Sequence, residues 1–122
     1  PVYCHVEADR DMIYQAIMNL VSNALKYTPN DGSVAVTVRA DESRNVAICE
    51  VADTGAGIPT DDLPHIFDKF YRVKDNNKLA KGTGLGLTLV KHMIETVHDG
   101  KISVASEKDK GSTFCFELPL IP

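Results

Sequence analysis

The chain of 122 residues carries a formal net charge of −4 and is 43% apolar and 25% charged, which is the size and composition of one water-soluble globular domain. Its acidic balance and the lack of any Lys/Arg block argue against a nucleic-acid-binding protein. Because the apolar runs are short and no signal peptide opens the chain, we expect neither a membrane-spanning segment nor direct membrane contact.

Three cysteines, Cys4, Cys49 and Cys115, are odd in number and far apart in the sequence. This pattern is typical of thiols in a reducing cytoplasm, and not of disulfides or a zinc site. We therefore expect a cytoplasmic protein. The abrupt start at "PVYCHVEADRD" also suggests a single domain, residues 1–122, of something longer.

The first expected element is a helix over residues 10–27, with Asp9 as its N-cap and "TPNDG" at its end. Its apolar residues recur at helical spacing: Ile13, Ile17, Leu20 and Ala24. Two antiparallel strands are expected next, over 33–40 and 46–53. The first of them alternates valines (Val34, Val36, Val38) with smaller or polar residues and is expected to be half-buried.

The second half of the chain begins with "TGAGIP", which breaks the strand, and "TDDLPHIFDKFY", a short helical stretch interrupted by Pro64. Residues 72–81 are polar and without period, which predicts a mobile loop. A second long helix is expected over 85–97, and a hairpin of two strands over 100–107 and 112–119. Helices and antiparallel strands in these proportions predict a two-layer α+β sandwich.

The stretch "LAKGTGLGLTLVK" (79–91) places three glycines at alternate positions before the second helix. Glycines there commonly let backbone amides approach a phosphate at a helix N-terminus. Neither a P-loop nor a dinucleotide fingerprint fits, since Leu87 stands where the third glycine of the fingerprint is required. The loop therefore needs another explanation.

Two amides, Asn19 and Asn23, share one face of the first helix with Lys26, and Tyr27 is beside them. A solvated helix face is one interpretation. The other is that the amide oxygens bind Mg²⁺ while the lysine meets a phosphate, because hard cations prefer oxygen ligands.

Two further clusters allow both a structural and a functional interpretation. Asp53, Gly55 and Gly57 at the end of a strand form either a plain turn or a pocket in which the aspartate accepts the amine of a base and the glycines leave room for its ring. In "IFDKFYR", the aromatic residues Phe67, Phe70 and Tyr71 are typical of a core. Its cations, Lys69 and Arg72, could instead fold onto a triphosphate.

Taken in order, these motifs resemble the catalytic ATP-binding domain of bacterial sensor histidine kinases, in the Bergerat-fold ATPase superfamily shared with gyrase, MutL and a heat-shock chaperone. "NLVSNALKYTP" is similar to the N box of that family, "DTGAGIP" to its G1 box, "IFDKFYR" to its F box and "GTGLGL" to its G2 box. The resemblance extends from about Asp9 to Pro119. It implies a mixed, mainly antiparallel sheet of about five strands packed against about three helices.

The resemblance also implies roles for individual residues. Asn23 would coordinate Mg²⁺ with support from Asn19, and Lys26, Arg72 and Lys69 would contact the phosphates. Asp53 would accept the adenine amine, with Ser112 or its competitor Thr113 near the base. The other residues implied to contact ATP are Tyr27, Gly55, Gly57, Ile58, Phe70, Lys81, Gly82, Thr83, Gly84, Leu85, Gly86 and Leu87.

Two departures from the family pattern concern loops. "ETVHDGKI" is one residue longer than the commonest family form and has Asp99 where glycine is frequent, and we interpret it as a loop variation. Lys81 also replaces a frequent glycine.

The hydrolase branch of the superfamily carries a glutamate four residues before the magnesium-binding asparagine. Here that position is Asn19, and an amide cannot act as a general base. The γ-phosphoryl group is therefore expected to pass to a histidine of an upstream dimerisation domain, and from there to a response regulator. None of His5, His65, His92 and His98 lies in the acceptor context. We expect an isolated domain that is monomeric and a whole kinase that is a homodimer. The alternatives are an anti-sigma-factor-type serine kinase and a non-catalytic nucleotide-sensing module.

Overall fold

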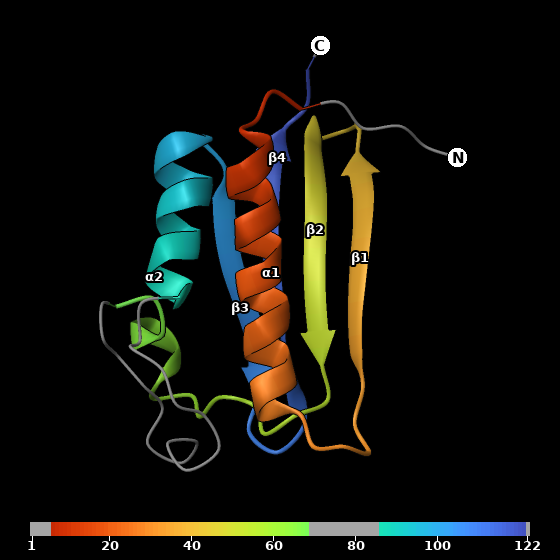
Figure 1. The fold of residues 1–122 in the computed structure, drawn as a ribbon, viewed down its shortest axis with the longest axis vertical. Helices are drawn as coiled ribbons and strands as arrows, with labels where there is room; N and C mark the ends of the chain where they lie inside the picture. The colour runs from red at the N-terminus through yellow and green to blue at the C-terminus, as the bar shows by residue number, and fades with distance from the viewer. Residues whose placement is uncertain (1–5, 69–85, 122) are drawn as a thin grey trace.

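The computed structural model describes residues 6–68 and 86–121, and its helices and strands form two layers (Figure 1). In chain order the elements are α1 (Arg10–Tyr27), β1 (Val34–Asp41), β2 (Val46–Asp53), η1 (Leu63–His65), α2 (Gly86–Lys91), η3 (His92–Val97), β3 (Lys101–Glu107) and β4 (Gly111–Pro119). The α+β class expected from the sequence is confirmed. The described residues hold four strands, all paired antiparallel, so the expected count of about five and the mixed pairing are not met within them.

Helix α1 begins and ends at side-chain caps. The carboxylate of Asp9 accepts a hydrogen bond from the Met12 N–H at 3.0 Å, as an N-cap does. At the other end, the Thr28 hydroxyl donates to the Ala24 carbonyl at 2.7 Å. Leu20 and Ala24 are fully buried, as expected, and face the sheet together with other apolar residues of the core.

The strand order is β1-β2-β4-β3, and one face of this sheet carries the helices. Val51 of β2 pairs with Phe114 of β4, which pairs with Val104 of β3. Because side chains alternate along a strand, this row lies on the helix side, and Val51 and Phe114 are almost completely buried there. The row continues on β1 with Val36.

The expectation that β1 is half-buried through its valines is wrong for two of them. Val36 is 49% exposed and Val38 is 64% exposed, although both lie on the helix side of the sheet. The reason is that β1 is the edge strand of the sheet, and α1, which packs on β2 and also contacts β1, leaves the side chains of Val36 and Val38 uncovered (Figure 1). Alternation along β1 shows which face each side chain takes, but it does not determine whether that face is covered.

The second long helix is not a continuous α-helix. It starts as α2 and continues over His92–Val97 as the π-helix η3, which ends where the Gly100 N–H donates to the Ile94 carbonyl at 2.8 Å. A π-helix accommodates one extra residue within a helix. The stretch "ETVHDGKI" therefore begins within η3 and continues through the connection after it into β3, and its interpretation as a loop variation stays a prediction. Asp99 adopts a φ of 58°, the left-handed conformation that glycine adopts readily.

The remaining expectations concern smaller features. The helical stretch predicted around Pro64 is a single 3₁₀ turn, Leu63–His65, in which Pro64 is the second residue. Cys49 and Cys115 are free and lie on opposite faces of the sheet, and burial raises the pKa of the Cys49 thiol to about 11. In the two stretches that the structure describes, no helix has the length and hydropathy needed to cross a bilayer.

Candidate functional site

The turn after β2 holds Asp53 in a partly buried position at the end of the sheet. The carboxylate accepts hydrogen bonds from the backbone N–H of Gly55, at 2.9 Å, and from that of Ser112. Burial raises the pKa of Asp53 above its ordinary value, and the two N–H donors counteract only part of that shift. The site therefore holds a carboxylate that is directed by two hydrogen bonds and is costly to ionise.

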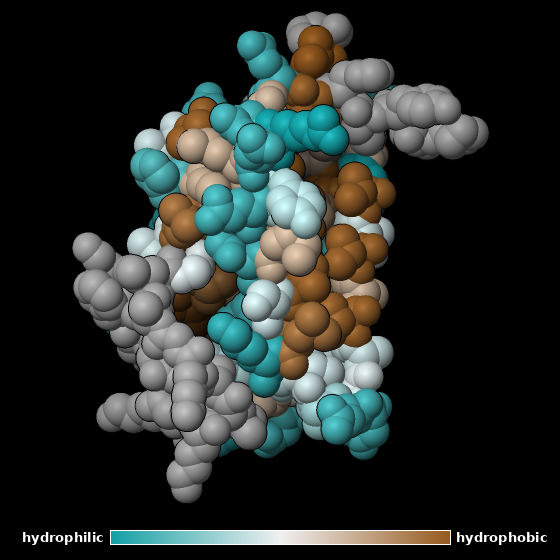
Figure 2. All heavy atoms as spheres, viewed as in Figure 1, coloured by the Kyte–Doolittle hydropathy of each residue, from teal (hydrophilic) through white to brown (hydrophobic). Residues whose placement is uncertain are grey.

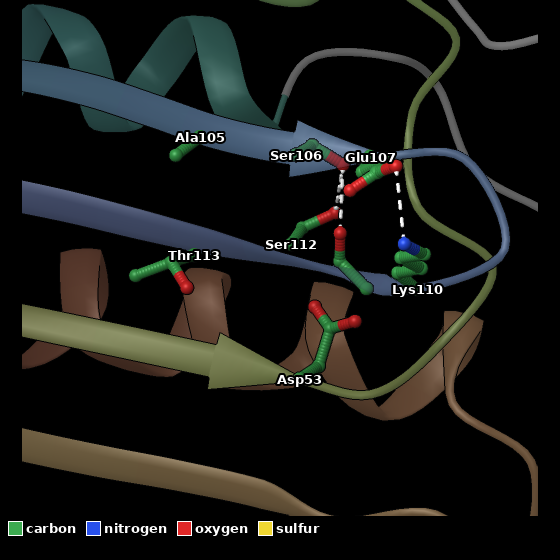
Figure 3. A pocket seen from close by; sticks show the side chains of 8 residues that line it. Asp53, Ala105, Ser106, Glu107, Lys110, Ser112 and Thr113 are labelled. Carbon is green, nitrogen blue, oxygen red and sulfur yellow. Dashed lines mark hydrogen bonds and ion pairs between the residues drawn. The ribbon is translucent and has the colours of Figure 1, made fainter.

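A serine pair supports this turn from the neighbouring strands (Figure 3). The Ser106 hydroxyl accepts a hydrogen bond from the Ile58 N–H at 2.8 Å and donates toward the Gly111 carbonyl at 2.9 Å. The Ser112 hydroxyl lies 2.8 Å from the Ser106 hydroxyl. Ser106 is not among the residues that the sequence predicts for the site. The available signal is a polar residue at an inward position of β3, after Ile102 and Val104.

The side chains of Ser112 and Thr113 lie on opposite faces of the sheet. Ser112 pairs with Asp53 in the β2–β4 register and is buried on the helix side of the sheet. Thr113 pairs with Ala52 on one side and Ala105 on the other, so its side chain lies on the opposite face. Of the two competing residues, only Ser112 shares a face with Asp53.

Gly55 and Gly57 allow close contacts between backbones. A Cβ at Gly55 would lie 2.2 Å from the Tyr27 carbonyl oxygen, at the end of α1. Gly57 has a φ of +71°, and a Cβ there would lie 2.0 Å from the Glu107 carbonyl oxygen, in the β3–β4 hairpin. The N–H of Ala56, which lies between the two glycines, donates a hydrogen bond to the backbone carbonyl of Tyr27 at 3.1 Å. The contacts that require glycine at these positions are thus with the protein's own backbone, whereas the sequence suggested room for a base.

The polar face of α1 lies directly beside this turn. Asn19 and Asn23 are half-buried, Tyr27 is half-buried and Lys26 is exposed. Among the hydrogen bonds within residues 6–68 and 86–121, none involves the amide side chain of Asn19 or Asn23. Two amide oxygens one helical turn apart suit a hard, partly hydrated cation such as Mg²⁺. The predicted donor set is therefore compatible with that ion.

Phe67, after η1, contacts α2. The Phe67 ring packs edge-on against the Phe114 ring, with centroids 6.3 Å apart, and its backbone carbonyl accepts a hydrogen bond from the Thr88 hydroxyl at 2.9 Å. The Lys91 ammonium lies 5.8 Å from the same ring. Phe67 is thus a core residue, as one interpretation of its motif held. Thr88 is a supporting residue that the sequence does not single out.

The other predicted site residues divide into two sets. Ile58 is buried in the core, Leu87 is half-buried against it, and Gly86 is exposed at the first position of α2. Outside the described residues lie Lys69, Phe70, Arg72, Lys81, Gly82, Thr83, Gly84 and Leu85.

An open pocket of about 380 Å³ lies at the same end of the sheet. Its lining comprises Asp53, Ala105, Ser106, Glu107, Lys110, Gly111, Ser112 and Thr113 (Figure 3). Ala105 and Thr113 belong to the face away from the helices, and no residue of α1 contributes. The pocket therefore includes the predicted base-binding residues Asp53 and Ser112, but not the predicted magnesium and phosphate ligands.

The described histidines have structural surroundings or are exposed. The His98 Nε2 accepts a hydrogen bond from the Asp9 N–H at 2.9 Å, and its Nδ1 lies 2.7 Å from the Met93 carbonyl, which joins the start of α1 to the end of η3. His65 pairs with Asp68 at 3.1 Å, and His92 is exposed. His5 lies outside the described residues.

Residues 8–122 match the family model described as "Histidine kinase-, DNA gyrase B-, and HSP90-like ATPase". The chain belongs to this family. The chain is 42% identical to the sensor histidine kinase WalK of Bacillus subtilis over 94% of its own length. It carries the ATP-binding fold of the family, and it spans only 19% of WalK. The solved catalytic domain of the histidine kinase ThkA superimposes with a TM-score of 0.80 at 35% identity, over 96% of this chain and 73% of that one. The full-length kinase ShkA, solved in complex with AMPPNP, matches with a TM-score of 0.80 at 31% identity, over 97% of this chain and 23% of that one.

We predict that Gly57→Ala strongly destabilises the domain. A left-handed alanine costs about 1–2 kcal/mol, and forcing its Cβ against the Glu107 carbonyl adds about 1–3 kcal/mol. The matched control is Gly86→Ala, because a Cβ at Gly86 meets nothing within 4 Å and alanine favours a helix by up to about 1 kcal/mol. Urea denaturation of both variants measures the difference. Equal stability of the two variants would contradict the backbone contact at Gly57.

Proposed function

We propose that this domain binds Mg²⁺-ATP and transfers the γ-phosphoryl group to a histidine on a separate dimerisation domain, for relay to a response regulator. The observation that carries the proposal is the juxtaposition of the Asp53 turn with the helix α1 that bears Asn19 and Asn23, in a chain of the histidine kinase family. In this proposal the enzyme is cytoplasmic and works as a homodimer, with the acceptor helix of its own or its partner subunit as substrate.

The base end of the site is formed by Asp53. Its carboxylate already accepts two backbone N–H bonds, which fix its orientation and leave acceptor capacity for the exocyclic amine of adenine. Ser112, buried beside it, holds the strand end in place through Ser106. A buried acceptor of this kind discriminates strongly against bases that lack the amine, because it would otherwise remain unpaired.

The phosphate end is formed by the polar face of α1. Asn23, with Asn19 one turn before it, would hold Mg²⁺, and the exposed Lys26 would meet a phosphate oxygen as a point charge. When bound, the ion neutralises the charge that develops on the transferred group. Arg72, Lys69 and the amides of the glycine-rich segment are proposed to contact the phosphates as the family resemblance implies.

The residue at position 19 supports transfer to a protein side chain and not to water. An amide cannot remove a proton from water, so the domain has no general base at the position where the hydrolase branch places one. The acceptor is proposed to lie outside this chain, because His98 is engaged in structural contacts and neither His65 nor His92 has the acceptor context.

The phosphotransfer prediction is tested by mixing the domain with a fragment that carries the acceptor helix and with radiolabelled ATP. We expect an acid-labile phosphoprotein that forms only when both proteins are present, because the two reacting groups lie on different domains. An acid-stable product would point to a serine kinase. Confirmed Mg²⁺-ATP binding without any phosphoprotein would leave a nucleotide-sensing module and contradict the kinase proposal.

A second prediction concerns the metal. Asn23→Ala removes an amide oxygen from the proposed coordination sphere, and we expect the dependence of ATP affinity on Mg²⁺ to disappear, as measured by calorimetry with and without the ion. Ser22→Ala, one position earlier and exposed, is the matched control. If both variants keep the magnesium dependence of the parent, the N-box assignment is wrong.

A third prediction concerns the base and pH. Asp53→Asn should reduce ATP affinity about 10–100-fold, the value of a hydrogen bond to a charged group, and should abolish the preference for ATP over inosine triphosphate. Binding by the parent should weaken as pH falls through the raised pKa of Asp53, because the protonated carboxyl is a poorer acceptor. Fluorescence titration at several pH values measures both effects.

The same substitution should leave the fold intact. A carboxyl whose pKa is raised by folding stabilises the native state below its unfolded pKa of about 3.9, and that contribution is lost as pH rises through the folded pKa. At neutral pH the ionised Asp53 is therefore no net source of stability, and Asp53→Asn is expected to keep or raise the thermal midpoint. A collapse of stability would mean that the loss of binding reports unfolding.

A further inference from the structure

The hydroxyl of Ser106 makes three short contacts behind the base end of the candidate site. It accepts a hydrogen bond from the Ile58 N–H at 2.8 Å, and it lies 2.9 Å from the Gly111 carbonyl oxygen and 2.8 Å from the Ser112 hydroxyl oxygen. Figure 3 shows the last two contacts as dashed lines that meet at Ser106. A serine hydroxyl has one proton to donate and two lone pairs with which to accept, so three contacts use it completely.

This count of protons fixes the direction of the contact between the two serines. A carbonyl oxygen cannot donate, so the 2.9 Å contact of Ser106 with Gly111 is attractive only when the Ser106 proton lies in it. The 2.8 Å contact between the two hydroxyl oxygens also requires a proton, because lone pairs that face each other at this distance repel. Ser106 has no second proton. The Ser112 hydroxyl is therefore the donor of this bond, and Ser106 is its acceptor.

Ser112 is left with lone pairs only for a ligand. Its hydroxyl proton is directed at Ser106, and its backbone N–H is directed at the carboxylate of Asp53. Ser112 and Asp53 are register partners on the helix side of the sheet, and both line the open pocket. The Cβ atoms of such partners lie about 4.5–5.5 Å apart, so a group bound at the carboxylate also lies beside the hydroxyl. At this point the pocket offers a ligand two acceptors, one of them charged.

The cation among the lining residues of the pocket does not change this polarity. Lys110 belongs to the hairpin between β3 and β4, and its ammonium lies 3.3 Å from the carboxylate of Glu107. Its side chain is 71% exposed, so water solvates the charge. The charge of Lys110 is thus matched by Glu107 and by solvent, and the selection of a base depends on Asp53 and Ser112.

We propose that Ser106 is a positioning residue that determines base specificity. It holds the Ser112 hydroxyl with its lone pairs toward the pocket, so that both pocket groups favour the exocyclic amine of a 6-aminopurine and repel a base with a carbonyl oxygen in its place. The inference rests on the proposed function, because it concerns the base of the nucleotide that is proposed to bind at the same site.

The test compares the binding of ATP and of inosine triphosphate, in which a carbonyl oxygen replaces the amine, by calorimetry with Mg²⁺. Ser106→Ala releases the Ser112 proton, which can then turn toward the carbonyl oxygen of the inosine base. We expect the ratio of the two dissociation constants, inosine triphosphate over ATP, to fall about 3–10-fold, the value of one neutral hydrogen bond. Loss of structural support alone would weaken the binding of both nucleotides by the same factor and leave this ratio unchanged.

Three further variants separate the role of the hydroxyl from that of the fold. Ser106→Thr keeps a hydroxyl and should hold the ratio within about 2-fold of its value in the parent protein. Ser103→Ala makes the control substitution on the same strand, at an exposed position on the opposite face of the sheet, and should leave the ratio equally unchanged. In a Ser112→Ala background, Ser106→Ala should change the ratio by less than about 2-fold, because its effect passes through the Ser112 hydroxyl.

The outcomes distinguish this proposal from the proposed function. An unchanged ratio in a folded Ser106→Ala variant, beside a parent protein that prefers ATP, would overturn the role of Ser106 and leave ATP binding established. A parent protein that binds neither nucleotide would overturn both.

A second measurement needs no substitution, and it decides the question even where Ser106→Ala does not fold. Neutron diffraction from deuterated crystals of the domain locates the hydroxyl deuterons directly. We expect the deuteron of Ser106 on the line to the Gly111 carbonyl and that of Ser112 on the line to Ser106. A Ser112 deuteron that points into the pocket would contradict the proposal.

Discussion

The turn that follows β2 is held between two backbone segments, and the candidate site depends on that contact. On one side the Ala56 N–H donates to the last carbonyl of α1, from Tyr27, and on the other the Asp109 N–H donates to the Ala56 carbonyl. The backbone of α1 lies so close to Gly55, and that of the β3–β4 hairpin so close to Gly57, that neither position has room for a Cβ. Three elements distant in sequence are thereby brought to one point: the end of the helix with the amides, the end of the central strand and the β3–β4 hairpin.

This contact explains why a carboxylate can be kept partly buried at the sheet end. Asp53 loses hydration there, which raises its pKa, and the fold compensates in part with two N–H donors. The serine pair behind it joins β3, β4 and the turn into one hydrogen-bonded unit. A ligand that supplies a further hydrogen-bond donor stabilises such an acceptor. The partial burial of the Asp53 carboxylate is therefore both the energetic cost of the site and the source of its specificity for a base with an amine.

The two sides of α1 have different relations to the rest of the molecule. One apolar stripe forms the core with the sheet, and the polar face with Asn19 and Asn23 lies beside the candidate site. Tyr14, Met18 and Leu25 of the same helix are exposed, as are Val36 and Val38 of β1 (Figure 2).

The sequence by itself determined the elements and the motifs. Alternation and helical spacing predicted α1, β2 and the β3–β4 hairpin, since these patterns are local, and the four boxes in order predicted the family. Only the tertiary structure decided what depends on contacts between distant residues. These features are the exposure of Val36 and Val38, the opposite sheet faces of Ser112 and Thr113, the hydrogen bonds of Ser106, and the π-helix η3. Local patterns say toward which side a residue points, whereas burial and hydrogen bonding require knowing which segment lies there.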